Sequence, residues 1–195
     1  MKRIKLVLGS ASLRRRQLLS VHFKLKIRSP NINEAVGRSE KPLAYVKRMA
    51  LLKWQALAND LEPGEILITA DTVVIHDKKI FSKARSSREA AQMLRKMSGQ
   101  THKVSTAVCV GGLKSRPFLQ VITTKIKFRS LCELEIAKYI RSNEWRGKAG
   151  AYGIQGLAAG FVKEMDGSLT NVIGLPLEES LELIRAAVSS VSRTG

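Results

Sequence analysis

The feature that most constrains the fold is a nearly continuous apolar run over residues 66–75, broken by Asp71 and Thr72. A run of this kind is typical of a strand that is buried on both faces. A charge left unpaired in such surroundings is costly, so Asp71 must be paired, bound to a metal ion, or placed at the strand end facing a cleft. The plainer alternative is a strand-end aspartate whose oxygens accept hydrogen bonds from the backbone.

Around this strand the sequence alternates between helix and strand patterns. Ser12 stands where a helix N-cap is expected. Residues 86–89, beginning with Ser86, and residues 130–133 each resemble a capping box, and Pro176 begins the last helix. Helices are expected at residues 13–21, 42–57, 86–97, 133–142 and from 175 onward, and further strands at 4–8, 25–29, 104–110 and 118–128. This mixture predicts an α/β or α+β fold with a mixed sheet.

The helix expected at residues 42–57 has an apolar face. Its predicted core-facing residues are Leu43, Val46, Met49, Ala50 and Leu57. Because these residues recur at helical spacing, they are expected to pack on the sheet, with Lys53 close to the same face.

The composition is that of a globular protein with an unusually basic surface. Hydrophobic residues make up 44% of the 195, and no apolar stretch approaches the ~20 residues that span a bilayer. The net charge of +18 is uneven, at +11 in residues 1–60, +8 in 61–130 and −1 in 131–195. Such a field attracts polyanions, although a basic solvated surface without a partner explains it equally well. Cys109 and Cys132 form no close pair, so a reduced cytoplasmic setting is expected.

The first turn after the opening strand has the pattern of an anion site. A strand, then Gly9, Ser10, Ala11 and Ser12, then a helix would point free backbone N–H groups at a ligand. Ser10 and Ser12 can donate to phosphate oxygens, and Arg14 and Arg15 can hold them in a forked geometry. The sequence is neither a Walker A loop nor a dinucleotide fingerprint, and the plainer alternative is a capped, basic, solvated helix.

Two acids and a glycine-rich segment are the other candidates for chemistry. Glu34 lies in a polar loop and could join Asp71 around Mg²⁺, which prefers few carboxylates together with substrate oxygens. Residues 148–156 are rich in glycine and alanine, so backbone could approach a base closely while Gln155 hydrogen-bonds its edge. Taken alone, Glu34, Lys53 and Lys83 are ordinary surface residues and the glycine-rich segment is an ordinary turn or bulge.

Taken together, these pieces resemble the Maf family of nucleoside triphosphate pyrophosphatases, within the wider group that includes the inosine triphosphate pyrophosphatases. The matching elements run nearly end to end and in order. They are SASLRR at residues 10–15, Glu34, Lys53, DTVV at 71–74, Lys83, SGQTHKV at 98–104, AGAYGIQG at 149–156 and NVIGLP at 171–176. No single element is specific, but eight in order are. The chain departs from the family at Leu13 and Ala84, where the family usually has proline.

The resemblance implies a fold and a reaction. It implies that residues 1–195 form a single Maf-like domain, α/β in class, with a mixed twisted sheet, flanking helices and two lobes around a cleft. It also implies hydrolysis of a nucleoside triphosphate to the monophosphate and pyrophosphate with a divalent cation, Mg²⁺ or Mn²⁺. Glu34 and Asp71 would hold the cation, and Asp71 would take a proton from the attacking water.

The resemblance also implies how the substrate is held and chosen. Arg14, Arg15, Lys53 and Lys83 would bind the triphosphate and offset the charge that develops during the reaction. Arg14, Thr72 and Gln155 occupy the positions that sort substrates, in a combination similar to the subgroup that acts on dTTP and UTP. Modified pyrimidine nucleotides would suit the same pocket.

Two other functions remain open from the sequence. One is a basic nucleic-acid-binding protein without catalysis, and the other is a pyrophosphatase for purine triphosphates such as ITP. The family resemblance also implies a homodimer, and the basic surface leaves nucleic acid open as an additional partner. No membrane partner is expected.

Overall fold

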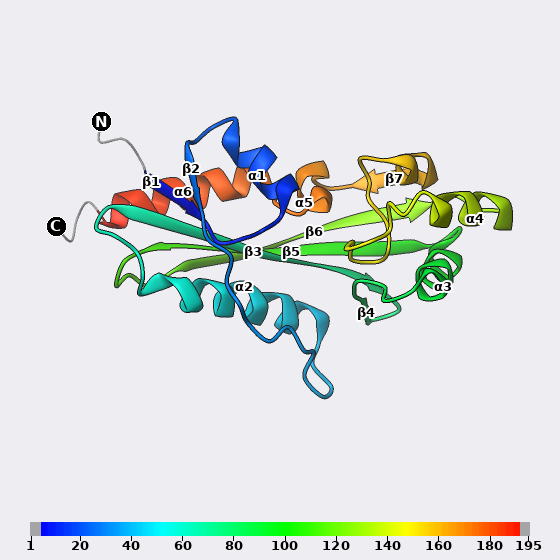
Figure 1. Ribbon diagram of the computed structural model, residues 1–195, viewed down its shortest axis with the longest axis horizontal. Coiled ribbons are helices and arrows are strands. Elements are labelled where there is room, and N and C mark those ends of the chain that lie inside the picture. The colour runs from blue at the N-terminus through cyan, green and yellow to red at the C-terminus, as the bar shows by residue number, and fades with distance from the viewer. Residues whose placement is uncertain (1–4, 192–195) are drawn as a thin grey trace. The chain divides into compact units, whose positions relative to one another are not determined.

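The computed structural model describes residues 5–191 and contains two compact units (Figure 1). Unit 1 comprises Met1–Asp71, Thr106–Ile122 and Gly174–Gly195, and unit 2 comprises Thr72–Ser105 and Thr123–Ile173. The terminal residues 1–4 and 192–195, including Ile4 of the predicted first strand, lie outside the described part of the chain. Three long strands contribute residues to both units: β3 (Glu65–His76), β5 (Thr101–Gly112) and β6 (Phe118–Phe128).

Within residues 5–191 the strands form one sheet of seven, which is mixed as predicted. The order is β2-β1-β3-β5-β6-β7, and β4 pairs with β3 off this path. Strand β1 runs parallel to both β2 and β3, whereas the β3–β4 and β6–β7 pairs are antiparallel. The shorter strands are β1 (Lys5–Leu8), β2 (Leu25–Ile27), β4 (Lys79–Phe81) and β7 (Val162–Asp166). With its flanking helices, the sheet confirms the predicted mixed α/β fold.

Unit 1 has helices on both sides of its strands. Helices α1 (Leu13–Ser20) and α6 (Leu177–Val191) lie on one side and α2 (Pro42–Ala58) on the other (Figure 1). On this side the helices and alternate strand residues form one core. From the strands it contains Leu6, Leu8, Ile66, Ile68, Ala70, Val108 and Val110, and from α1, α6 and the residues before α6 it contains Leu19, Leu175, Ile184 and Ala187. Residues of β1 and β3 that point the other way, such as Val7 and Leu67, are buried too. Burial on both faces explains why residues 66–75 lack a polar alternation.

Helix α2 buries the predicted face except in its first turn, since Val46, Met49, Ala50 and Leu57 are buried. Leu43 is 46% exposed, so its predicted place in the core is wrong, whereas Tyr45 and Trp54 are buried. Leu43 lies in the first turn, beside Pro42, while the buried stripe begins with Tyr45 and Val46. Tyr45, Met49 and Lys53 therefore lie four residues apart along one side of the helix, which becomes important at the site.

Unit 2 is built around aromatic side chains. Phe128, Tyr139, Tyr152 and Phe161 make edge-on ring contacts, with centroids 5.0–5.9 Å apart. The helices of this unit are α3 (Ser87–Met97), α4 (Glu133–Arg141), the short 3₁₀ helix η1 (Leu157–Phe161) and α5 (Leu169–Ile173). Helices α3 and α4 pack on each other. These contacts anchor the segment over residues 148–156, because Tyr152 lies within it.

The caps of α3 and α4 differ in how well they agree with the sequence. Ser86 caps α3 by accepting a hydrogen bond from the backbone N–H of Glu89, as predicted. The capping box predicted at residues 130–133 is displaced, since α4 begins after Cys132, whose N–H donates to the side chain of Glu135 at 3.1 Å. Glu133 instead pairs with Arg95 on α3. Among residues 5–191, no helix has both the length and the apolar content needed to cross a membrane.

Candidate functional site

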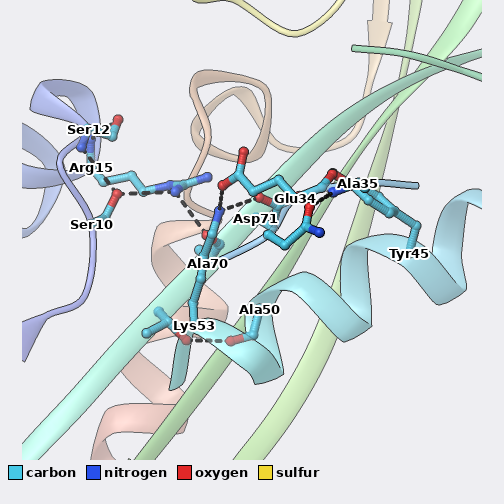
Figure 2. A network of polar contacts seen from close by, with 12 residues as sticks. Ser10, Ser12, Arg15, Glu34, Ala35, Tyr45, Ala50, Lys53, Ala70 and Asp71 are labelled. Carbon is cyan, nitrogen blue, oxygen red and sulfur yellow. Dashed lines mark hydrogen bonds and ion pairs between the residues drawn. The ribbon is translucent and has the colours of Figure 1, made fainter. Parts of the chain in front are cut away.

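The charged side chains of Lys53, Glu34 and Asp71 lie together in unit 1. The Nζ atom of Lys53 lies 2.7 Å from Asp71 Oδ1 and 2.7 Å from Glu34 Oε1, so one ammonium group holds two carboxylates (Figure 2). The side chains of Lys53 and Asp71 are only 11% and 12% exposed, whereas that of Glu34 is 44% exposed. The structure thus brings together Asp71 and Glu34, which the sequence predicts as acids of one site, and pairs both with Lys53.

Each of these side chains comes from a different part of the unit. Asp71 ends the unit 1 portion of β3, Lys53 lies on α2, and Glu34 lies between β2 and α2. The α2–β3 contact is fixed one turn before Lys53, where the Thr69 hydroxyl donates to the carbonyl of Ala50 at 2.8 Å. Because this bond joins backbone of the helix to the strand, Lys53 faces Asp71 in a defined register.

The segment that carries Glu34 is tied to α2 by side chains that the sequence did not single out. Tyr45 Oη donates to the Glu34 carbonyl at 2.9 Å, and Arg48 Nη2 donates to the Ala35 carbonyl at 3.0 Å. Within the segment, Asn33 Oδ1 accepts from the Ala35 N–H at 2.9 Å. The spacing of Tyr45 eight residues before Lys53 on one helix was the available signal, but it does not show that the Tyr45 hydroxyl reaches the backbone of residue 34.

The first turn of α1 is organised as its sequence predicts. Ser12 is the N-cap and accepts from the Arg15 N–H at 3.4 Å, while the N–H of Ser12 donates to Ser10 Oγ at 3.1 Å. Ser10 is buried and Ser12 is half-buried. Arg14 is half-buried at the second position of the helix.

Arg15 has a different environment from the one expected of a phosphate-gripping side chain. Its Nε donates to the Gly174 carbonyl at 2.8 Å, and its Nη1 donates to the Ala70 carbonyl at 2.9 Å and to Ser10 Oγ at 3.2 Å. Burial lowers the pKa of Arg15, and the negative charge of Asp71 opposes that shift. Arg15 therefore holds the backbone immediately before Asp71, a contact that the pattern of residues 10–15 does not reveal (Figure 2).

The remaining predicted site residues belong to unit 2. Thr72 directly follows Asp71 in β3. Lys83 forms a β-bridge with Ala149, and the N–H of Gly150 donates to the Phe81 carbonyl at 2.9 Å. The structure thus brings Lys83 beside the start of the glycine-rich segment.

Gln155 is exposed, and the backbone on both sides of it is fixed. The Gly153 N–H donates to Tyr139 Oη at 3.2 Å, and the Leu157 N–H donates to Glu144 Oε2 at 2.9 Å. A Cβ atom at Gly156 would clash with the carboxylate of Glu144 in its present position, so glycine permits this close approach. Gly150 is required for another reason, since its φ of +67° is in the left-handed region.

With this geometry established, the comparisons with known proteins are informative. Residues 5–187 match the family described as Maf-like protein. The chain belongs to the Maf family. It is 42% identical over 190 residues to a protein of Nitrobacter hamburgensis named dTTP/UTP pyrophosphatase, covering 93% of this chain and 91% of the relative.

A second relative extends the Maf match to nearly the whole length of both chains. It is a dTTP/UTP pyrophosphatase of Photorhabdus laumondii, 41% identical over 193 residues and covering 97% of each chain. Among solved structures, a HAM1 protein from Coxiella burnetii is similar with a TM-score of 0.47 and 13% identity, covering 80% of this chain and 90% of that one.

The two departures from the usual Maf pattern lie in ordinary surroundings. Leu13 is the first residue of α1 and is 64% exposed. Ala84 packs on the core of unit 2. Neither substitution removes one of the charged side chains described above.

The donor set of this Maf chain fits a hard divalent cation that keeps water and substrate oxygens. No cluster of three or more His, Cys, Asp or Glu side chains suited to a metal occurs among residues 5–191. Glu34 and Asp71 each contact Lys53 through one of their two carboxylate oxygens. The two oxygens that contact Lys53 lie no further apart than twice 2.7 Å, because both lie 2.7 Å from the same nitrogen atom. Mg²⁺ commonly binds through one or two carboxylates together with phosphate oxygens.

Proposed function

We propose that this chain hydrolyses dTTP and UTP, releasing the nucleoside monophosphate and pyrophosphate. The observation that carries the proposal is the contact of one lysine ammonium with two carboxylates at 2.7 Å, on residues that the Maf pattern assigns to the reaction. The names of the two relatives described above support the choice of substrate. Modified pyrimidine nucleotides are included in the proposal as substrates of the same type.

Asp71 is the proposed general base. It takes a proton from water as the water oxygen bonds to phosphorus, and the bond between the α- and β-phosphates breaks so that pyrophosphate leaves. The contact with Lys53 keeps the Asp71 carboxylate in one orientation, and the bond from Arg15 to the Ala70 carbonyl fixes the backbone beneath it. A base held in this way needs little reorganisation when the proton moves.

The proposed divalent cation, Mg²⁺ or Mn²⁺, would be held by Glu34 and Asp71. When bound, it would supply positive charge beside the phosphate oxygens. Lys53 contributes a further positive charge from the chain itself, and because it is only 11% exposed, that charge is weakly screened by solvent. The proposed catalytic residues are Glu34, Asp71, Lys53 and Lys83.

Binding and selection of the nucleotide are assigned to other residues. Ser10, Ser12 and Arg14 are proposed to bind phosphate oxygens at the first turn of α1, where backbone N–H groups add partial positive charge. Arg15 is proposed to support this turn through Ser10 as well as to bind substrate. Gln155, with Thr72 and Arg14, is proposed to select the base, since an exposed amide can donate and accept along the edge of uracil or thymine.

The cellular setting is part of the proposal. Cys109 and Cys132 are both free thiols, which supports the proposed cytoplasmic location. That residues 1–195 act as a single domain, that the chain forms a homodimer and that its basic surface contacts nucleic acid all stay predictions.

Pyrophosphate release tests the proposed function directly. We would compare dTTP, UTP, CTP, GTP and ITP with Mg²⁺ or Mn²⁺, using the parent chain and Asp71→Asn. The expected result is release from dTTP and UTP that falls by about 10³-fold or more in the variant, because the proton acceptor is lost. A preference for ITP would support the alternative hypothesis of a pyrophosphatase for purine triphosphates. A folded parent that releases pyrophosphate from none of the five nucleotides would refute the proposal.

A further inference from the structure

We propose that Tyr45 and Arg48 are positioning residues for Glu34, holding its backbone on α2 so that its carboxylate reaches Lys53. This inference rests on the proposed function, because it assigns a task to Glu34. It adds two residues that act through Glu34 without touching the nucleotide.

The segment between β2 and α2 needs such support. It runs from residue 28 to residue 41 without a helix or strand, and loops of this length in compact proteins are usually functional or disordered. Glu34 lies near its middle with a side chain that is 44% exposed, so the carboxylate is not fixed by burial. Besides the ion pair with Lys53, bonds to the backbone at residue 34 can fix the position of Glu34.

Tyr45 supplies the first of these bonds. Its side chain is buried, and its hydroxyl donates to the carbonyl of the same residue whose carboxylate contacts Lys53. A tyrosine hydroxyl is protonated at neutral pH and can donate this hydrogen bond.

Arg48 supplies the second bond, one residue further along. Its Nη2 donates to the Ala35 carbonyl, while Nε and Nη2 hold the two oxygens of Glu40 at 2.7 Å and 2.6 Å. Glu40 also accepts from the Gly37 N–H at 2.9 Å, which closes the turn at the end of the segment. The Arg48 guanidinium lies 5.5 Å from the centre of the Tyr45 ring, so the two anchors support each other.

The arrangement places three tasks on one helix face. Tyr45 binds the backbone of residue 34 and Lys53 binds the Glu34 side chain (Figure 2). Arg48 binds the backbone of residue 35. Since α2 is itself bonded to β3 through Ala50 and Thr69, the segment is held in register with Asp71. Loosening the backbone should therefore act on the reaction only through Glu34.

Two conservative variants test this. Tyr45→Phe removes one hydroxyl, and Arg48→Gln removes the bonds to Ala35 and Glu40. With saturating dTTP we expect kcat to fall about tenfold in each, because each variant removes one hydrogen bond to the backbone of residues 34 and 35, and a tenfold change corresponds to about 1.4 kcal/mol. The Mg²⁺ concentration for half-maximal activity should rise several-fold while KM changes little. Arg95→Gln is the matched control, because it also breaks a bidentate arginine–glutamate pair, in unit 2, and should keep parent activity.

A double-mutant cycle separates positioning from a general structural role. In a Glu34→Gln background, Tyr45→Phe should cause little further loss, since its effect passes through the Glu34 carboxylate. Losses of equal size in both backgrounds would overturn the inference, as would parent-like kcat and Mg²⁺ dependence in both single variants.

Hydrogen exchange keeps this test distinct from that of the proposed function. Amides of residues 30–40 should exchange at least several-fold faster in both variants, with α2 and β3 unchanged. A parent without pyrophosphatase activity would refute the proposed function together with any role in it. Unchanged exchange in residues 30–40 would overturn the attachment itself, whatever the activity of the parent.

Discussion

The segment around Glu34 in unit 1 and the glycine-rich segment in unit 2 are both irregular, but they are held in different ways. The first is fixed by side chains of α2 that bind its carbonyl groups, and its functional side chain is drawn to Lys53. The second is fixed through its N–H groups by Tyr139 and Glu144, and glycines permit the close approaches. Gln155 between these bonds remains exposed.

The difference indicates a division of tasks. In unit 1, opposite charges are held within hydrogen-bond distance, which suits the stabilisation of charge during a reaction. In unit 2, fixed backbone surrounds an uncharged amide, which suits recognition by hydrogen bonds. Variants in the first region should therefore change the rate for all bases, and variants in the second should change the preference among them.

The largest expected effect is that of Lys53→Met. The variant loses the cation that holds both carboxylates, so we expect kcat for dTTP to fall at least about 100-fold. Lys26→Met is a matched control in the same unit, because Lys26 also bonds two acids, Glu62 at 2.8 Å and Glu65 at 2.9 Å. Lys26→Met should keep parent turnover. Lys26, Glu62 and Glu65 line a cavity of about 380 Å³. Pyrophosphate release by the two folded variants makes the comparison, and equal losses would break the assignment.

Gly156→Ala should act on preference more than on rate. The added methyl would displace the Glu144 carboxylate, which accepts from the Leu157 N–H and so holds the segment that carries Gln155. We expect the ratio of kcat/KM for dTTP to that for CTP to fall about tenfold, equivalent to about 1.4 kcal/mol. Gly160→Ala is the control, because a methyl there meets no atom within 4 Å among the described residues. An unchanged ratio in Gly156→Ala would remove the link between Glu144 and base choice.

The core of unit 2 should respond to pH through His102. Burial lowers the pKa of His102 to about 3, with a smaller contribution from His76, and the ring shares a 2.8 Å hydrogen bond with Tyr152. The unfolded chain therefore binds a proton below about pH 6.5 that the folded chain does not, and the free energy of unfolding falls as the pH is lowered. Between pH 7 and 5.5 this loss should be about 1 kcal/mol larger in the parent than in His102→Gln. Denaturant titrations at both pH values measure the free energy of unfolding. An equal fall of this free energy in the parent and in His102→Gln would contradict the prediction.

The smallest expected effect is that of Leu13→Pro. Leu13 is the first residue of α1, and Ser12 before it has φ −69° and ψ 114°, a conformation compatible with a following proline. The substitution should raise the free energy of unfolding by about 0.4–1 kcal/mol by restricting the unfolded chain. Thermal unfolding measures this, and a destabilised variant would mean that α1 does not tolerate the proline of its family.

The sequence was sufficient for elements whose local signals agree with their packing. Residues 66–75 are β3 because burial on both faces requires an uninterrupted apolar run, and Ser12 and Ser86 are caps because their hydroxyls satisfy free N–H groups. Asp71, Glu34 and Lys53 could be grouped through the family pattern, and the structure brings these three side chains together.

The rest depended on tertiary contacts that no local pattern encodes. The exposure of Leu43 and the burial of Tyr45 follow from how helix α2 packs on the sheet. The contacts of Arg15 with Ala70 and Gly174 join residues 55 and 159 positions apart in the chain. The displaced cap at Cys132 reflects a choice between two glutamates, one of which pairs instead with Arg95.

The division of tasks between the two segments is tested most directly by Gln155→Ala. We would measure pyrophosphate release from dTTP, UTP and CTP by the parent and this variant at the same Mg²⁺ concentration. We predict that the variant continues to release pyrophosphate while its preference for dTTP and UTP over CTP falls at least about tenfold. The same preference in both proteins, or an equal loss with all three nucleotides, would contradict it.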